Sequence, residues 1–345
     1  KGYIFADVNF VYPNSPAAKA GLKRGDLITH MNGERMTTDN YTDLYYASQL
    51  TLGLSNDETS EPYETKTLTA QTYAIDPVLD YGLIPLEHLT IGYMIYTDFV
   101  FRGNASLAQL NHVFQTLKAA NIDEFILDLR YNQGGYIFAV KQLCSLLAPE
   151  EVVENEELLI HKRWNKAYQE RYANDPDRLE EHFDKSVPLD SRLNLKRLWV
   201  ITSHVTASAS EMLISALSPY MKVNVVGDLT MGKNMGGIIY TPNDKDLQNW
   251  NIMLISTEYS NSREESVKGG IPPMFPILEQ FHHQHQLGDQ EEPLLAATLQ
   301  LITQDTIATP VMNSRSSRSL DTGTPRRIIP KFVQAKSRLL LGIEN

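Results

Sequence analysis

The stretch "RLWVITSHVTASASEMLISALSPYMKVNVVG", from Arg197 to Gly227, decides the fold. Its apolar pattern predicts a strand, a helix that begins at Ser208, and a second strand. An earlier stretch, "FILDLRYNQGG" from Phe125 to Gly135, is nearly all apolar up to Arg130, which is typical of a strand covered on both faces. A helical pattern follows it. Strand–helix–strand units repeated in this way predict a parallel sheet with right-handed crossovers.

In such a sheet, the loops beyond the carboxyl ends of the strands gather at one edge and carry the function. Three loops are expected there, namely Tyr131–Gly135, Ser203–Ala207 and Asp228–Asn234. Ser208 follows the second loop, and Glu211 stands three residues later, which is the pattern of a helix capping box. The question is whether Ser208 only caps this helix or acts as a nucleophile.

A serine nucleophile needs a nearby base and hydrogen-bond donors for the oxyanion that develops on the attacked carbonyl. At a helix N-terminus, Ser208 would lie beside the unpaired N–H of Ala209 and the positive end of the helix dipole. The two glycines of "NQGG" would bring a second N–H close to a substrate. In the third loop, "TMGKN" presents Lys233 as the candidate base.

The first 80 residues have a different character. "FVYPNSPAAKAGLKRGDLITHMNGERM", from Phe10 to Met36, predicts a strand, one helical turn stopped by Gly21, and a strand ended by Asn32–Gly33. This stretch resembles a PDZ domain, and a small β-domain with conventional turns is the alternative. PDZ domains bind a peptide C-terminus through a loop before their first strand. Too few residues precede Tyr12 to identify that loop, so we expect a peptide-binding domain truncated at its N-terminus.

Three motifs, "DLRYNQGG", "TASASE" and "GDLTMGKN", together resemble the C-terminal-processing, or tail-specific, serine peptidases. That family joins a PDZ domain to a crotonase-like α/β core and uses a serine–lysine pair. The resemblance implies that Ser208, and not Ser210, is the nucleophile and that Lys233 is the general base. It also implies an oxyanion hole made by the backbone N–H groups of Gly135 and Ala209.

The fold class that follows is an α/β crotonase-like catalytic core with a parallel sheet, preceded by a small β-rich PDZ-like domain. We expect the PDZ-like domain over residues 1–80 and the Ser/Lys peptidase core over 86–305. A charged, mostly helix-favouring insertion interrupts the core at about 150–192. The resemblance covers roughly residues 7–303 and leaves a basic tail over 306–345 unexplained.

Within the insertion, Trp164, Tyr168 and Tyr172 recur every four residues, which predicts one face of a helix. Such a stripe is expected to pack on the body of the protein. A substrate cradle is the alternative, and a lid over the active site would satisfy both interpretations.

The chain departs from the family at one position. Many members carry a glutamine four residues after the lysine that helps to orient it, and Gly237 stands there. Asn234 is a candidate replacement. A free lysine has a pKa near ~10.4, so a lysine base needs that pKa lowered by ~3 units, usually by desolvation. The apolar neighbours expected to desolvate Lys233 are Met231, Met235 and Ile238–Tyr240.

Histidines offer two further hypotheses. His204 lies four residues before Ser208 and would be the base of a serine–histidine pair, but on the approach turn we expect it only to border the pocket. His282, His283 and His285 suggest a metal site. Because no acidic or cysteine partner shows metal-ligand spacing, we predict neither a metal nor another cofactor.

Charge and composition exclude several classes of protein. The net charge is −11 over 345 residues, but Val311–Asn345 holds seven Lys/Arg and two Asp/Glu, so the other 310 residues carry −16. An acidic body does not suit nucleic-acid binding. The tail is either a partner-binding arm or, as we favour, lies along its own acidic body. No apolar run reaches the ~20 residues of a membrane helix. The one cysteine, Cys144, excludes an internal disulfide and is expected in the core.

The sequence therefore predicts a serine endopeptidase that forms an acyl-enzyme on polypeptides, including unfolded chains or free C-termini, with the PDZ-like domain recruiting or gating them. Two alternatives stay open. One is a peptide-binding protein of weak or no activity on the same fold, and the other is a hydrolase of non-peptide acyl substrates. The chain begins partway into a strand, as if a leader had been removed, and the family resemblance implies export to the periplasm or lipid anchoring at the cell envelope.

Overall fold

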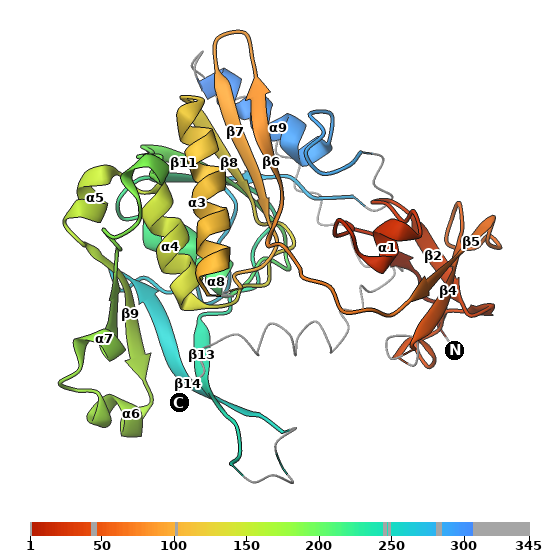
Figure 1. Cartoon of the computed structure of the whole chain (residues 1–345), viewed down its shortest axis with the longest axis horizontal. Helices are drawn as coiled ribbons and strands as arrows, with labels where there is room; N and C mark the ends of the chain where they lie inside the picture. The colour runs from red at the N-terminus through yellow and green to blue at the C-terminus, as the bar shows by residue number, and fades with distance from the viewer. Residues whose placement is uncertain are drawn as a thin grey trace. The chain divides into compact units, whose positions relative to one another are not determined.

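The computed structural model describes residues 2–42, 47–100, 103–243, 247, 250–280 and 285–305. These residues form two compact units (Figure 1). Unit 1 contains the first 79 residues together with the segment that begins at Glu279, and unit 2 contains Asp80–Leu278. The predicted domain boundaries stay predictions, with the added observation that the segment after Leu278 groups with unit 1. The basic tail lies outside the described residues.

Unit 1 holds a five-stranded sheet. Its path is β1-β2-β4-β5, and β3 pairs with β2. The strands are β1 (Ala6–Asp7), β2 (Leu27–Met31), β3 (Glu34–Arg35), β4 (Gln49–Leu54) and β5 (Glu64–Thr69). The predicted tight turn joins β2 to β3, with positive φ at both Asn32 and Gly33, as a type I′ hairpin requires.

The one-turn helix α1 (Pro16–Lys19) lies where the sequence predicts it. Ser15 caps it by accepting the N–H of Ala18 at 3.1 Å, and Pro16 occupies the first helical position, where no N–H is needed. Gly21 has φ 75°, which ends the turn. The core of this unit is made by Leu22, Ile28, Met31, Met36, Leu52 and Leu54.

Unit 2 is built on the predicted parallel sheet. Its order is β15-β12-β11-β8-β7-β6, and the strands from β7 to β15 along this path are parallel. The strands are β6 (Val78–Pro85), β7 (Thr90–Tyr96), β8 (Glu124–Asp128), β11 (Arg197–Thr202), β12 (Lys222–Gly227) and β15 (Phe275–Pro276). Every residue of β8 is buried, as expected of a strand covered on both faces.

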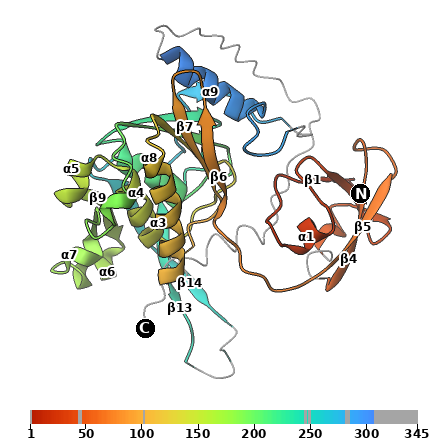
Figure 2. The same cartoon turned by 45° about the horizontal axis from the view of Figure 1, so that its top comes forward.

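Helices cover this sheet. α3 (Asn104–Ala119) and α4 (Ile137–Leu147) lie side by side in both views (Figure 1, Figure 2). α8 (Ala209–Leu217) contacts α4, β12 of the parallel sheet, and β9 and β14 of a second sheet. Every residue of α8 is therefore buried, including Ser210 and Glu211. The remaining long helix, α9 (Pro293–Asp305), belongs to the segment grouped with unit 1.

The second sheet corrects the prediction of a mostly helical insertion. It has the order β10-β9-β14-β13 and is antiparallel. The strands are β9 (Leu158–Trp164), β10 (Glu180–His182), β13 (Met235–Tyr240) and β14 (Ile252–Asn261). Only short helices remain in the insertion, namely α5 (Glu150–Glu154), α6 (Lys166–Arg171), α7 (Pro176–Leu179) and the 3-10 turn η1 (Leu189–Ser191). Charged residues favour helix locally, but pairing with β14 overrides that preference.

The aromatic stripe is not one helical face. Trp164 ends β9, and Asn165 then caps α6 by accepting the N–H of Tyr168 at 3.1 Å. The three rings still cluster, because the centroids of Trp164, Tyr168 and Tyr172 lie 5.1 to 5.8 Å apart. The hydroxyl of Tyr168 bonds that of Tyr240 at the end of β13, so the cluster contacts the second sheet.

The fold bears on the single cysteine and on the question of a membrane helix. Cys144 is completely buried in α4, as predicted, and burial raises the pKa of its thiol. Among the described residues, no helix has both the length and the apolar character needed to cross a membrane.

Candidate active site

Ser208 lies at the N-terminus of α8 with φ 58° and ψ −115°. A non-glycine residue rarely adopts this conformation, which costs about 1 to 3 kcal/mol and persists only where the surroundings impose it. The predicted capping-box pair is present, and the N–H of Ser208 donates to the Glu211 carboxylate at 2.8 Å. Ser208 therefore begins the helix, as predicted, in a backbone conformation that capping alone does not require.

The carboxylate of Glu211 joins this turn to the loop after β12. It is completely buried and accepts four hydrogen bonds. One oxygen receives the hydroxyl of Thr230 at 2.5 Å and the N–H of Gly232 at 2.6 Å. The other receives the N–H groups of Ser208 and Lys233, both at 2.8 Å. The main chains of the two predicted catalytic residues therefore meet at a single carboxylate oxygen.

Asn132 fixes the loop after β8 against the same turn. Its amide donates to the carbonyl of Tyr96 at 2.8 Å, and its side-chain oxygen accepts the N–H of Gly134 at 2.9 Å. Its own carbonyl accepts the N–H of Ala207 and the hydroxyl of Ser210, both at 3.1 Å. Ser210 is completely buried, and its hydroxyl is used to hold the loop after β8 against this turn.

The two glycines of this loop let its backbone lie close to neighbouring residues, while their predicted approach to a substrate stays a prediction. A Cβ at Gly134, where φ is 101°, would lie 2.7 Å from the Cβ of Ser208 and 2.8 Å from the nitrogen of Ala209. A Cβ at Gly135, where φ is 150°, would lie 2.3 Å from the carbonyl oxygen of Phe99. No other residue fits either position without moving the backbone.

The N–H groups of Gly135 and Ala209 are not used within the described part of the chain. The neighbouring N–H groups, those of Gly134, Tyr136 and Ser210, each have an acceptor. These two backbone donors lie in the loop after β8 and in the turn at Ser208, and the predicted oxyanion hole stays a prediction.

A buried ion pair holds the end of β8. The Arg130 guanidinium donates to the Asp128 carboxylate at 3.0 and 2.8 Å, and both side chains are almost completely buried. The hydroxyl of Tyr93 donates to the same carboxylate at 2.9 Å. Two hydrogen bonds hold the loop before Ser208 against the residues that follow β8. The hydroxyl of Ser203 donates to the Arg130 carbonyl, and the hydroxyl of Thr206 donates to the Leu129 carbonyl.

The comparisons with known proteins agree with this geometry. Residues 90–276, more than half of the chain, match the profile of Peptidase family S41, and residues 8–50 match that of a PDZ domain. The chain belongs to peptidase family S41. The predicted family and fold class, an α/β core with a parallel sheet behind an N-terminal PDZ domain, are confirmed.

Relatives of the chain carry matching names. It is 25% identical over 227 residues to the carboxyl-terminal-processing protease of Synechocystis, which covers 64% of this chain and 48% of that protein. It is 27% identical over 282 residues to the chloroplastic carboxyl-terminal-processing peptidase 2 of Arabidopsis thaliana, covering 78% of this chain and 49% of that one. The chain spans about half the length of these relatives.

A solved structure extends the likeness to the fold. The crystal structure of a protein assigned to the S41 proteases, from Bacteroides fragilis, has a TM-score of 0.73 and 26% identity to this chain. The match covers 88% of this chain and 82% of that one. Both units of the chain therefore have counterparts within the S41 family.

Gly237, the departure from the family pattern, has a structural reason. A Cβ at Gly237 would lie 2.1 Å from the carbonyl oxygen of Leu254, because the pairing of β13 with β14 is irregular between Gly236 and Gly237. Position 237 therefore has no room for an orienting side chain. The candidate replacement, Asn234, donates its amide to the Ser266 hydroxyl at 3.0 Å.

The expected desolvation of Lys233 is found only in part. The Lys233 side chain is half-buried, and Ile238 and Ile239 of β13 are buried. Met231 and Met235, however, are largely exposed. Of the predicted apolar neighbours, Ile238 and Ile239 are therefore buried, whereas Met231, Met235 and Tyr240 are exposed.

His204 lies at the same edge of the sheet. Its side chain is half exposed, and Nδ1 lies 3.7 Å from the Asp228 carboxylate. Both residues belong to loops that the sequence places at this edge. The expectation that His204 only borders the pocket therefore stays a prediction.

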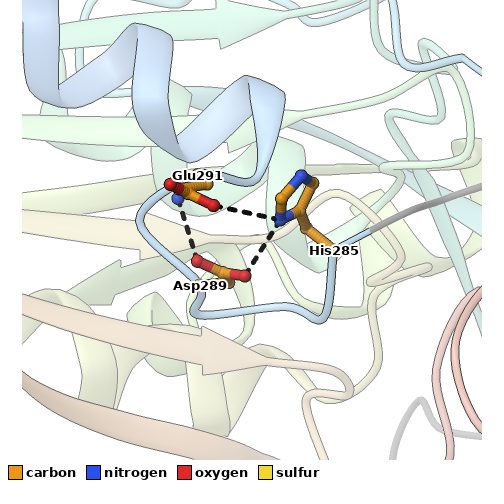
Figure 3. A group of neighbouring side chains, drawn as sticks. All are labelled: His285, Asp289 and Glu291. Carbon is orange, nitrogen blue, oxygen red and sulfur yellow. Dashed lines mark hydrogen bonds and ion pairs between the residues drawn. The ribbon is translucent and has the colours of Figure 1, made fainter.

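A group that sequence reasoning missed lies around His285 (Figure 3). Its Nδ1 lies 3.0 Å from the Asp289 carboxylate and 3.9 Å from that of Glu291. The N–H of Glu291 and the ring of His285 both bond Asp289 and lower the pKa of its carboxyl. The statement that no acidic partner shows metal-ligand spacing therefore overlooked Asp289 and Glu291, whose ligand atoms lie close to that of His285. The three form a hydrogen-bonded surface turn to which we assign no metal. His282 and His283 lie outside the described residues.

An open groove of about 1100 Å³ lies on the second sheet. It is lined by β9, by α6, and by β14 with the loop that follows it, and it reaches Asn234, the residue after Lys233. Its surface is mixed, with the rings of Trp164 and Tyr259 and the ammonium groups of Lys166 and Lys268.

Proposed function

We propose that the protein is a serine endopeptidase in which Ser208 is the nucleophile and Lys233 the general base. The observation that carries the proposal is the single Glu211 oxygen that binds the N–H groups of both residues. It ties a strained turn to the only loop of the three that offers a lysine. Membership of the S41 peptidases supports the same reaction class.

The reaction would proceed through an acyl-enzyme. Ser208 Oγ attacks the carbonyl carbon of the scissile bond, and its proton passes to neutral Lys233 Nζ. The N–H groups of Gly135 and Ala209 donate to the oxyanion. The C–N bond then breaks, the amine leaves with the proton from Lys233, and water hydrolyses the Ser208 ester. The strained conformation of Ser208 supports this role, because a nucleophile on a sharp strand-to-helix turn presents its hydroxyl to the substrate.

The substrate class follows from the two binding regions. The PDZ match supports recruitment or gating of polypeptides, unfolded or with a free C-terminus, by unit 1. The groove beside Asn234 supports a path for the chain on one side of the scissile bond. An exported protein, periplasmic or anchored at the cell envelope, is the setting we propose for such a substrate.

A second candidate function has one observation in its favour. Position 237 has no room for the side chain that orients the lysine in many relatives of this kind. A peptide-binding protein with little activity on the same fold would tolerate that loss. This candidate keeps the PDZ-like unit and the groove but needs no turnover at Ser208.

Incubation with a reduced, unfolded polypeptide and sequencing of the fragments tests the proposal. We expect new termini at internal positions with the parent chain and none with Ser208→Ala. Binding without fragments from the parent chain would support the second candidate. Turnover of a small ester in the absence of any peptide cleavage would support a hydrolase of another acyl substrate.

A further inference from the structure

The hairpin of β13 and β14 exposes an unusual number of apolar side chains. It projects from the rest of unit 2 in both views (Figure 1, Figure 2). Ile252 and Leu254 are 58% and 48% exposed, and Trp250, just before β14, is 68% exposed. A soluble protein rarely leaves such residues contiguous and uncovered unless something binds them.

Three of these side chains share one face, which we call the hairpin face. Tyr240 pairs with Ile252, and Ile238 pairs with Leu254, so the side chains of each pair point to the same side. Ile252 and Leu254 are two residues apart and lie on that side together. The hairpin face is therefore an exposed row of Tyr240, Ile252 and Leu254 that ends at the buried Ile238.

The tail of the same chain has the composition to cover this face. The segment "IIPKFVQAKSRLLLGI", Ile328–Ile343, is rich in large apolar residues and carries three cations and no acid. The tail as a whole carries +5 from Val311 onward, whereas the remaining 310 residues carry −16. Apolar residues interleaved with cations suit an apolar strand face on an acidic body.

Length and concentration also favour this occupant. The 22 residues from Thr306 to Arg327 can span about 70 Å when extended, which gives the segment a long reach from the end of α9. A tethered segment has an effective concentration that approaches the millimolar range, so it fills the site when the Kd of its contacts lies below that value.

We propose that the hairpin face of unit 2 is the docking site for Ile328–Ile343 of the same chain. β13 begins two residues after Lys233, so the docked segment lies along the strand that leads out of the candidate active site. The tail then shares this strand with any polypeptide that approaches the Lys233 loop from the hairpin side. The proposal concerns a binding surface and holds whether or not Ser208 is catalytic.

Cysteine cross-linking in the full chain tests the docking. The single native cysteine, Cys144, is completely buried and leaves added thiols as the reactive ones. Leu254→Cys with Ala335→Cys should form an intramolecular cross-link with a short bismaleimide. Ile255→Cys with Ala335→Cys is the matched control, because Ile255 pairs with Gly237 on the opposite face and is also exposed. We expect the first pair to react about tenfold faster or more than the control.

Two tail variants in the first cysteine pair separate apolar docking from charge. Ile328→Ser with Ile329→Ser and Phe332→Ser should reduce the rate to that of the control pair. Arg315→Ser with Arg318→Ser, upstream of the segment, should leave most of the rate. Equal rates for the Leu254 and Ile255 pairs would overturn the proposal and leave the face to another partner. Cross-links only between chains, rising with protein concentration, would overturn it in favour of a second copy.

Discussion

At the scale of single residues, Glu211 is the group that the sequence identified only as a helix-capping residue. It accepts from Ser208, Thr230, Gly232 and Lys233 while completely buried. A capping box needs only the first of these contacts. The other three come from a loop about twenty residues downstream, and no local pattern reveals them.

Glu211→Gln should therefore damage the site more than a lost cap would. The amide NH₂ would face backbone donors, leaving N–H groups of the Lys233 loop unpaired at a cost of about 1 to 3 kcal/mol. We expect the rate of Ser208 acylation to fall about 100-fold or more, because the turn and the loop separate. Glu151→Gln, an exposed glutamate of α5, is the control. Undiminished acylation of Glu211→Gln would show that this carboxylate does not position the two residues.

Ser208 and Ser210 should respond differently to removal of the hydroxyl. Ser208→Ala should abolish peptide cleavage and keep the fold, apart from a cap loss of about 1 kcal/mol. Ser210→Ala removes a hydrogen bond to the Asn132 carbonyl, which still accepts the N–H of Ala207, so we expect most of the activity to remain. Cleavage assays paired with thermal unfolding compare the two. Equal loss of activity in both variants would contradict the assignment of Ser208.

At the scale of elements, the parallel sheet was predictable and the second sheet was not. β8 and β11 are apolar runs of strand length, so the sequence predicts both of them. The loops after them contain the glycine and serine motifs that mark the candidate site. β9, "LLIHKRW", lies in a charged segment, and its strand character comes from pairing with β14 almost a hundred residues later. Trp164 and Tyr168 are four residues apart, as on one face of a helix, but Trp164 ends a strand and Tyr168 lies in the helix that begins after it. Spacing alone cannot distinguish this arrangement from a single helix.

Asp184 fastens the insertion to α4. It accepts from Gln142 at 2.7 Å and from Ser186, and its own N–H donates to Ser145 at 2.9 Å. Burial works to raise the pKa of this carboxyl, but the hydrogen bonds from Ser186 and Gln142 and the charge of Lys141 outweigh it, so the pKa lies below its ordinary value.

The sign of this shift gives a pH-dependent prediction. A depressed folded-state pKa adds stability above the unfolded pKa of ~3.9 and loses it as the pH falls toward the folded value. Asp184→Asn should lower the Tm by about 2 °C at pH 7. The difference from the parent should shrink below about pH 4, as thermal scans across pH would record. A constant difference across that range would mean that the carboxylate charge is not what fastens the insertion.

At the scale of the whole molecule, Arg24 makes unit 1 a composite of two distant segments. Its guanidinium is buried and donates to the carbonyls of Asn9 and His285 and to the Glu279 carboxylate, and it lies 3.6 Å from Glu292. The sequence places this arginine in the PDZ-like motif "GLKRGD" without indicating partners more than 250 residues away. A deletion of residues 1–80 would therefore remove the PDZ-like domain and also the Arg24 contacts that hold the segment after Leu278.

Arg24→Met tests this composite with a single substitution. Removing one partner of a buried ion pair leaves uncompensated carboxylates and costs about 3 to 5 kcal/mol. We expect an early unfolding step detected by hydrogen exchange in both segments of unit 1, with labelling of Ser208 retained. Lys19→Met, an exposed cation of α1, is the control. Unfolding confined to the N-terminal segment would contradict the composite unit.

The central claim is that neutral Lys233 takes the proton of Ser208, and one measurement tests it directly. It is the rate at which a fluorophosphonate probe labels Ser208 across pH in the parent, Lys233→Arg and His204→Ala. In the parent the rate should rise with pH through the lysine pKa and level off above it. Because arginine keeps its proton, Lys233→Arg should not label, while His204→Ala should label nearly as fast as the parent. Labelling of Lys233→Arg at the parental rate, or loss of labelling in His204→Ala, would contradict the serine–lysine mechanism.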